Sequence, residues 1–169
     1  ADGIGAEGVR LVFENLPKVV ADPNDIDARG NMLSAALMGA TAFQKGLGAI
    51  HSLSHPIGAL YNTHHGMTNG VFMPYVLVAN RDAIEARIAR LAAYCGLAPS
   101  FDAFLTAILA LREKLGVPHT LMDLKVPADR RSEIAVMAVA DPSTGTNPVK
   151  LDETLALRIF DMTIHGVLA

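Results

Sequence analysis

Apolar residues recur along this chain at steps of three to five positions and not at every second position. Near the start, Ile4, Val9, Leu16 and Val20 fall on one stripe of a helix. Pro23 ends that segment, because proline lacks the backbone N–H that a continuing helix needs. The pattern therefore predicts a helix over residues 4–20, and no alternating strand pattern follows it anywhere.

The same spacing predicts further helices along the rest of the chain. Asn24 or Asp25 can cap a helix toward residue 47 that is rich in small residues and expected to be central. The stretch 71–78 is apolar on all sides, as in a fully buried helix, even with Pro74 inside it. Other helices are expected over residues 81–94, 101–115 after a Ser100 cap, 128–139 and 152–165. The predicted fold class is all-α, a multi-helix bundle-like domain spanning residues 1–169.

Composition narrows the classes of protein to which the chain can belong. With 169 residues, 51% hydrophobic and 18% charged, it can bury a core and is too apolar to be disordered. No apolar run approaches the roughly 20 residues of a membrane span, and the net charge of -3 shows no Lys/Arg cluster for nucleic acid. The single Cys95 permits no internal disulfide and favours a reducing compartment, with the cytoplasm as the expected location. The chain has neither a starting Met nor a signal-peptide pattern, and we expect a fragment.

Four of the six histidines fall within residues 51–65, in the stretch HSLSHPIGALYNTHH. His51 and His55 are spaced i, i+4, which places them about 40° apart on one helix face, where they could share a metal or a pocket. A bare HxxxH is weak by itself, because Ser52 stands where zinc proteases of the HExxH type have glutamate. Two ordinary polar positions, or hydrogen-bonded core histidines, are the competing interpretation.

His65 can join this pair only if the chain turns back. Along one straight helix, 14 residues span roughly 21 Å, far more than two metal–nitrogen bonds of about 2.1 Å. Pro56 can kink the helix, Gly58 permits close approach, and residues 61–63 can form a loop. The sequence thus predicts a return after Pro56 that brings His51 and His65 to a shared point.

A second motif, GIGAEG at Gly3, Gly5 and Gly8, matches the dinucleotide fingerprint G-x-G-x-x-G. The fingerprint works only where a buried strand delivers the turn, and two residues before Gly3 cannot form that strand. We therefore expect no nucleotide site there. His119 is expected in a loop and His165 in the last helical turn, and neither needs a functional role.

The histidine stretch resembles the C-terminal signature of the iron-containing alcohol dehydrogenase family, GLGxxHxxxHxxGxxYNxxHGxxNxxxxPxV. Residues 46–76 read GLGAIHSLSHPIGALYNTHHGMTNGVFMPYV. The flanking segments ENLPKVVADPNDIDAR and DPSTGTNP are also similar to the family. The resemblance covers essentially the whole chain and implies the all-helical half of such an enzyme, related to dehydroquinate synthase-like proteins.

The resemblance implies roles for three residues. His51 and His65 match the family's two histidine metal ligands, and His55 matches a histidine near the nicotinamide and substrate that assists proton movement. The family's other ligands, an Asp and usually a His on an earlier helix, have no match here, and neither does the N-terminal nucleotide-binding domain. His64 matches a position where Pro is common, so no role is assigned to it.

The resemblance also implies the chemistry. In the family, Fe(II), or Zn(II) in some relatives, polarises the oxygen of a small alcohol for hydride transfer to NAD(P). The expected partners are the alcohol or aldehyde substrate, the missing nucleotide-binding domain and further copies of the chain in a homo-oligomer. With two of the ligands, the isolated chain is expected to hold metal weakly and to lack dehydrogenase activity.

Three alternatives remain open. A maleylacetate reductase or glycerol dehydrogenase relative would change the substrate and the use of metal but not the helical fold. A non-catalytic helical metal-binding module is a different class. A helical metal-dependent hydrolase is disfavoured, because no Asp or Glu occurs between Gly30 and Asn80.

Overall fold

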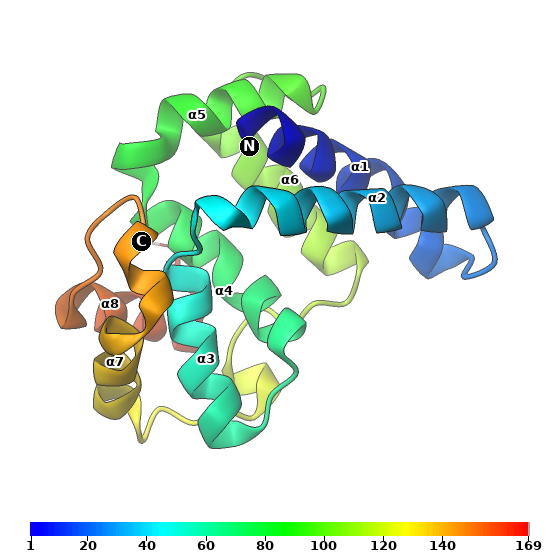
Figure 1. The fold of residues 1–169 in the computed structure, drawn as a ribbon. Helices are drawn as coiled ribbons and strands as arrows, with labels where there is room; N and C mark the ends of the chain where they lie inside the picture. Colours follow the sequence, from blue (N-terminus) through cyan, green and yellow to red (C-terminus); the bar gives the residue numbers. More distant parts are fainter. Residues whose placement is uncertain (169) are drawn as a thin grey trace. The chain divides into compact units, whose positions relative to one another are not determined.

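The structure, a computed structural model, describes residues 1–168 and is built from helices (Figure 1). Within these residues there is no strand, as the hydrophobic spacing predicts. The all-α fold class is therefore confirmed. The α-helices are α1 Asp2–Ala21, α2 Ile26–Ala42, α3 Ala49–Tyr61, α4 His65–Ala79, α5 Arg81–Tyr94, α6 Phe101–Lys114, α7 Arg131–Ala140 and α8 Glu153–His165, joined by short 3-10 turns η1 Phe43–Lys45, η2 Met122–Leu124 and η3 Pro142–Thr146.

The helix limits follow the local chemistry that the sequence displays. The side chain of Asp25 accepts a hydrogen bond from the Ala28 N–H and starts α2, and Ser100 does the same for Ala103 at the start of α6. Helix α5 has the predicted limits, whereas α7 begins at Arg131, later than the predicted residue 128. Within residues 1–168, no helix is both long enough and apolar enough to cross a membrane.

The described chain divides into two compact units. The first comprises residues 1–45 and 85–115, and the second comprises residues 46–84 and 116–169. The histidine stretch lies wholly in the second unit. A single domain for the whole chain stays a prediction.

In the first unit, α1 packs along α2 and also contacts α6. Gly8 allows the helices to approach closely, because a Cβ there would lie 3.3 Å from the Cβ of Met38. The buried Asn15 accepts a hydrogen bond from the Asn31 side chain across the same pair of helices. Gly8 thus serves helix packing, and the GIGAEG motif lies inside α1 and not in a phosphate-binding turn.

Helix α2 differs from the expectation of a central helix. Only Ala28 and Ala35 are buried, while Ile26 and Leu33 are each 75% exposed. Ala35 and Met38 lie against Gly8 of α1, whereas Leu37 is also largely exposed. The prediction of a central position for this helix was wrong, because small-residue content reports close packing on one face and not burial on all faces.

The second unit is a set of four helices around one core. Helix α3 packs on α4 and α7, and α8 packs on α4 and α7, so the contacts close into a ring. The fully buried Phe72 and Tyr75 of α4 lie in this core, which confirms the prediction of a buried helix there. Other members come from α3, α7 and α8, including Leu53, Ile57, Ile134, Ile159 and Phe160.

Glu7 connects α1 with α5 in the first unit. Its carboxylate pairs with Arg10 at 2.6 Å and accepts a hydrogen bond from the Tyr94 hydroxyl at 2.9 Å. The Arg10 hydrogen bonds and then the Tyr94 hydrogen bond lower the pKa of Glu7 from 4.5 to about 2. A carboxyl with a lowered pKa stabilises the fold above its unfolded pKa, and this contribution is lost as the pH falls toward the folded value.

We therefore predict that Glu7→Gln flattens the acid branch of the stability profile. Between about pH 4.5 and pH 2, the free energy of unfolding should fall less steeply in the variant than in the wild type. Urea unfolding followed by circular dichroism at several pH values measures this difference. Asp27→Asn is the control, and equal slopes in the wild type and Glu7→Gln would contradict the prediction.

Substitution by alanine should have opposite effects on stability at two glycines of residues 46–76. Gly46 has φ +117°, and a Cβ there would collide with the Thr146 side chain, whereas a Cβ at Gly58 meets nothing within 4 Å. Gly46→Ala should destabilise the protein by about 2–4 kcal/mol. Gly58→Ala, inside α3, should stabilise it by about 0.5–1 kcal/mol. Denaturant unfolding tests both, and the same sign for the two variants would disprove the argument.

Candidate active site

Three of the clustered imidazoles lie side by side in the second unit. The ring centroids of His51 and His65 are 5.3 Å apart, those of His55 and His65 are 5.4 Å apart, and those of His51 and His55 are 5.8 Å apart. His51 and His55 come from α3, and His65 is the first residue of α4. The return of the chain that the sequence analysis expects is therefore present.

The turn lies within residues 61–63, where the sequence predicts a loop. Helix α3 continues through Pro56 to Tyr61, and Asn62 then adopts a left-handed conformation with φ 53° and ψ 39°. Asparagine tolerates this conformation better than most residues, so it ends the helix as a C-cap. The return therefore falls after Pro56, as predicted, and Pro56 itself lies inside α3 without ending the helix.

His64 starts the next helix. Its Nδ1 accepts a hydrogen bond from the Met67 N–H at 3.2 Å, so the imidazole acts as the N-cap of α4. This role explains a histidine beside the cluster without any part in chemistry. His65, one residue later, is free to face His51.

The two predicted metal ligands point their Nε2 atoms at the same place. The Asn69 Nδ2 atom lies 3.4 Å from His51 Nε2 and 3.1 Å from His65 Nε2. An amide nitrogen carries two hydrogens and can donate to both rings, provided that both Nε2 atoms are unprotonated. The Nε2 atoms of the two rings therefore approach the same amide nitrogen, and an unprotonated Nε2 is the form of histidine that binds a metal.

The electrostatics of His51 favour this neutral form. Burial, and then the proximity of His65 and His55, lower the pKa of His51 below its ordinary value of 6.5. Asn69 contributes a further polar atom, because its Oδ1 is buried without a hydrogen-bond partner within the described residues. An unpaired buried oxygen costs about 1–3 kcal/mol, so this position is more polar than the fold alone requires.

Within residues 1–168, no three His, Cys, Asp or Glu side chains are arranged to hold a metal ion. His65 is exposed and His51 is partly exposed, so both rings are accessible from outside the unit.

His55 has a carboxylate partner that is distant in sequence. The Asp141 Oδ2 atom lies 2.7 Å from His55 Nδ1, while Asp141 Oδ1 accepts a hydrogen bond from the Ser143 N–H at 2.8 Å. Burial raises the pKa of Asp141, but the hydrogen bonds from His55 and Ser143 outweigh it and hold that pKa below its ordinary value of 3.8. The side chain is therefore a carboxylate at neutral pH.

The turn-rich segment that carries Asp141 holds α3 at several points. The Thr144 Oγ1 atom lies 2.8 Å from Ser52 Oγ, and the Thr146 hydroxyl donates to the carbonyl of Leu47. Its contact with Ser52 lies one helical turn before His55. The DPSTGTNP segment is thus a clamp on the histidine helix, a role that its turn-forming composition did not reveal.

Asn147 completes this clamp from a half-buried position. Its Oδ1 accepts from the Ala49 N–H at 3.0 Å, which supplies the N-terminal hydrogen bond that α3 gets from no capping side chain of its own. Its Nδ2 donates to the carbonyl of Val149 and to Asn80 Oδ1, and the Asn80 Nδ2 returns a bond of 3.1 Å. The network ties the start of α3 to the end of α4.

The other two histidines, His119 and His165, lie away from the cluster. His119 Nε2 lies 3.2 Å from the carbonyl of Gly166, and the hydroxyl of Tyr75 donates to the carbonyl of His119 at 2.7 Å. His165 is in the last turn of α8, where a cation favours the helix dipole. Neither histidine joins the cluster.

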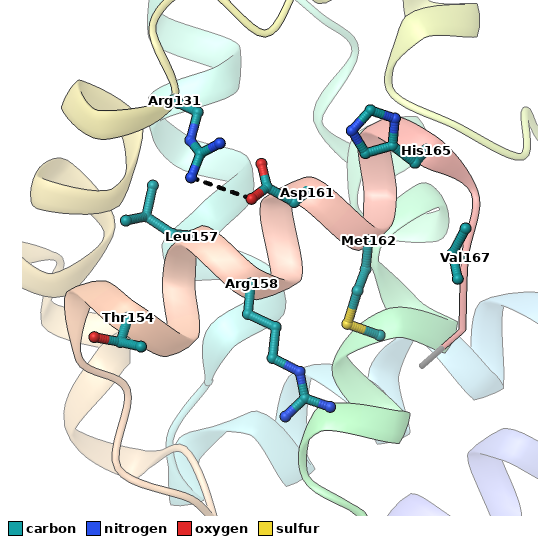
Figure 2. Close-up of a pocket in the computed structure, with 8 residues that line it drawn as sticks. All are labelled: Arg131, Thr154, Leu157, Arg158, Asp161, Met162, His165 and Val167. Carbon is teal, nitrogen blue, oxygen red and sulfur yellow. Dashed lines mark ion pairs between the residues drawn. The ribbon is translucent and has the colours of Figure 1, made fainter.

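A depression of about 780 Å³ runs along α8, lined by residues that include Arg131, Leu157, Met162 and His165 (Figure 2). Arg131 pairs there with Asp161 at 3.2 Å. None of the three clustered imidazoles lines it. We therefore do not take this hollow as the candidate active site, because the histidine cluster lies elsewhere in the second unit.

Comparison with known proteins agrees with this geometry. Residues 1–163 match the model of the Fe-containing alcohol dehydrogenase family, C-terminal. The chain belongs to this family. It is 39% identical over 157 residues to the 4-hydroxybutyrate dehydrogenase of Cupriavidus necator, covering 88% of this chain and 41% of that protein. It is also 32% identical over 155 residues to the NAD-dependent methanol dehydrogenase of Bacillus methanolicus, covering 87% and 41%.

The fold of the family is also present in solved structures. A 1,3-propanediol oxidoreductase superposes with a TM-score of 0.90 at 31% identity, covering 96% of this chain and 45% of that one. The chain thus spans less than half the length of these Fe-containing alcohol dehydrogenase relatives. Its helices match the all-helical C-terminal domain of the family.

Three residues at the site were not found by sequence reasoning. Asn69 could have been suspected from its i, i+4 spacing to His65 on a helix, which puts the two side chains on one face. Asp141 and Asn147 carry no such signal. Their partners, His55 and Ala49, are 86 and 98 positions away.

We predict that Asn147→Ala loosens the base of the histidine helix. The variant leaves Asn80 and the Ala49 N–H without their partner, which should lower the free energy of unfolding by about 2–3 kcal/mol. Urea unfolding gives the value. Asn24→Ala, at an exposed position of the α1–α2 turn, is the matched control and should change it by less than about 0.5 kcal/mol. A loss no larger than that of the control would contradict the prediction.

Proposed function

We propose that this chain is the metal-binding part of an NAD(P)-linked, metal-dependent alcohol dehydrogenase that interconverts a small alcohol and its aldehyde or ketone. In this proposal His51 and His65 are metal ligands, and His55 handles a proton beside them. The single observation that supports it best is the convergence of two Nε2 atoms on one position.

The donor set suits the metal that the family name implies. Imidazole nitrogens bind both Fe(II) and Zn(II), and the lowered pKa of His51 keeps its ring in the neutral, ligating form. Two imidazoles alone form an incomplete set, so we infer that an Asp and a His outside these residues complete it. When bound, the metal supplies a Lewis acid for the substrate oxygen.

The residues of this chain have separate tasks in the proposed reaction. His51 and His65 hold their Nε2 lone pairs toward one position, and Asn69 keeps both rings turned that way through its amide nitrogen. His55 exchanges the hydroxyl proton of the alcohol with its ring, as a general acid–base group. Hydride transfer needs NAD(P), which we expect to bind mainly outside the described residues.

The relatives are named for 4-hydroxybutyrate, methanol and 1,3-propanediol, all short alcohols or hydroxy acids. We infer a short alcohol as the substrate here. The cytoplasm and a homo-oligomeric assembly remain predictions, the first from the single cysteine and the second from the family resemblance.

Metal binding by the chain tests the ligand assignment directly. Zn(II) should bind the purified chain in isothermal titration, and His51→Gln and His65→Gln should each weaken the Kd by about 10-fold or more, because each removes one of two ligands. His165→Gln is the control, since that exposed histidine lies outside the cluster. Equal affinity in the wild type and both ligand variants would refute the assignment.

Catalysis needs the longest natural form of the protein that contains these residues. That form should reduce NAD(P) with a short alcohol, lose activity on chelation and regain it with Fe(II) or Zn(II). The 169-residue chain alone should be inactive. Metal-dependent activity with none of the alcohols tested but with maleylacetate reduction would instead favour the maleylacetate reductase alternative.

A further inference from the structure

The His55–Asp141 hydrogen bond joins an exposed imidazole to a shielded carboxylate. The two side chains come from α3 and from the residue before η3, and they meet at 2.7 Å, a length typical of a charge-assisted hydrogen bond. Asp141 is only 13% exposed, whereas His55 is 42% exposed. A shielded acceptor therefore holds one edge of an imidazole that is itself more exposed to solvent.

The direction of this hydrogen bond follows from the chemistry of its acceptor. Asp141 is ionised at neutral pH and a carboxylate can only accept, so the hydrogen must sit on His55 Nδ1. A neutral imidazole carries one hydrogen on its two nitrogens. With Nδ1 protonated, Nε2 has a free lone pair.

A second hydrogen bond fixes the orientation of the Asp141 carboxylate. Its other oxygen, Oδ1, accepts the Ser143 N–H at 2.8 Å as the N-cap of η3. The segment is in turn fastened to the histidine helix through Thr144 and Ser52, whose hydroxyl oxygens are 2.8 Å apart. The two oxygens of Asp141 thus have separate partners, and the backbone beneath them is fixed to the helix that carries His55.

We propose that Asp141 is a positioning residue that holds His55 in the tautomer with its hydrogen on Nδ1 and its Nε2 available to accept a proton. The proposal rests on the proton-handling role of His55 under the proposed function. It adds a residue 86 positions away whose carboxylate determines which ring nitrogen of His55 can accept a proton. A histidine in the other tautomer would offer a hydrogen where a lone pair is needed.

Asp141→Asn is a sharp test, because it can keep one of the two hydrogen bonds. The amide oxygen can still accept the Ser143 N–H, while an NH2 group replaces the oxygen that faces His55. That NH2 group donates to Nδ1, so the hydrogen of the ring should move to Nε2. Asp129→Asn is the matched control, since Asp129 accepts from the Tyr61 hydroxyl at 3.2 Å at the end of the same helix and does not contact His55.

Long-range ¹H–¹⁵N correlation spectra of the labelled chain, recorded over about pH 6–9 and assigned with His55→Gln, identify the protonated nitrogen. We expect Nδ1–H in the wild type and in Asp129→Asn, and mainly Nε2–H in Asp141→Asn. Mainly Nε2–H in the wild type, no change in Asp141→Asn, or an equal change in Asp129→Asn would overturn the proposal. If Asp141→Asn fails to fold, the wild-type spectrum still decides the tautomer.

Kinetics of the longest active form supply the second readout. Asp141→Asn should lower kcat by about 100-fold with KM changed by less than about threefold, because the variant alters proton transfer and not binding. The spectra need neither metal nor activity. A protein without dehydrogenase activity would therefore refute the proposed function while leaving the tautomer result intact, and an unchanged kcat would overturn the role of Asp141.

Discussion

The close approach of three imidazoles on two successive helices is the constraint on which the candidate active site depends. Burial, and then the proximity of the other two rings at 5–6 Å, lower the pKa of His51, because a charge on His51 would be poorly solvated and close to other imidazoles. Neutral rings have lone pairs to share. For His51, the surroundings that disfavour protonation also favour the neutral form that binds a metal.

Positioning of these rings depends on polar contacts from a segment remote in sequence. Asn147 satisfies the first turn of α3, Thr144 meets Ser52 a turn later, and Asp141 meets His55 beyond that. Hydrogen bonds of this kind contribute modestly to stability, about 1 kcal/mol each, but they specify direction in a way that apolar packing does not. The histidine face is thus oriented by hydrogen bonds on top of a core that supplies most of the stability.

The two units of the chain differ in their packing and in their polar groups. The second contains the histidine cluster, its clamp and a core of large apolar side chains. The first packs α1 on α2 through small residues and carries surface ion pairs such as that of Glu7 with Arg10. Exposed apolar residues on α2, such as Leu33, show that high apolar content along a helix need not mean burial within one chain.

The sequence by itself determined the helical class, the limits of α5, the buried character of α4 and the three histidines that meet. These features follow from local spacing, from capping residues and from a motif within 31 consecutive positions, 46–76. All three signals are local in the sequence. The outward face of α2 and the partners Asp141 and Asn147 were decided by the tertiary structure alone. A contact between residues 86 or 98 positions apart depends on how several helices pack, and no local pattern encodes that packing.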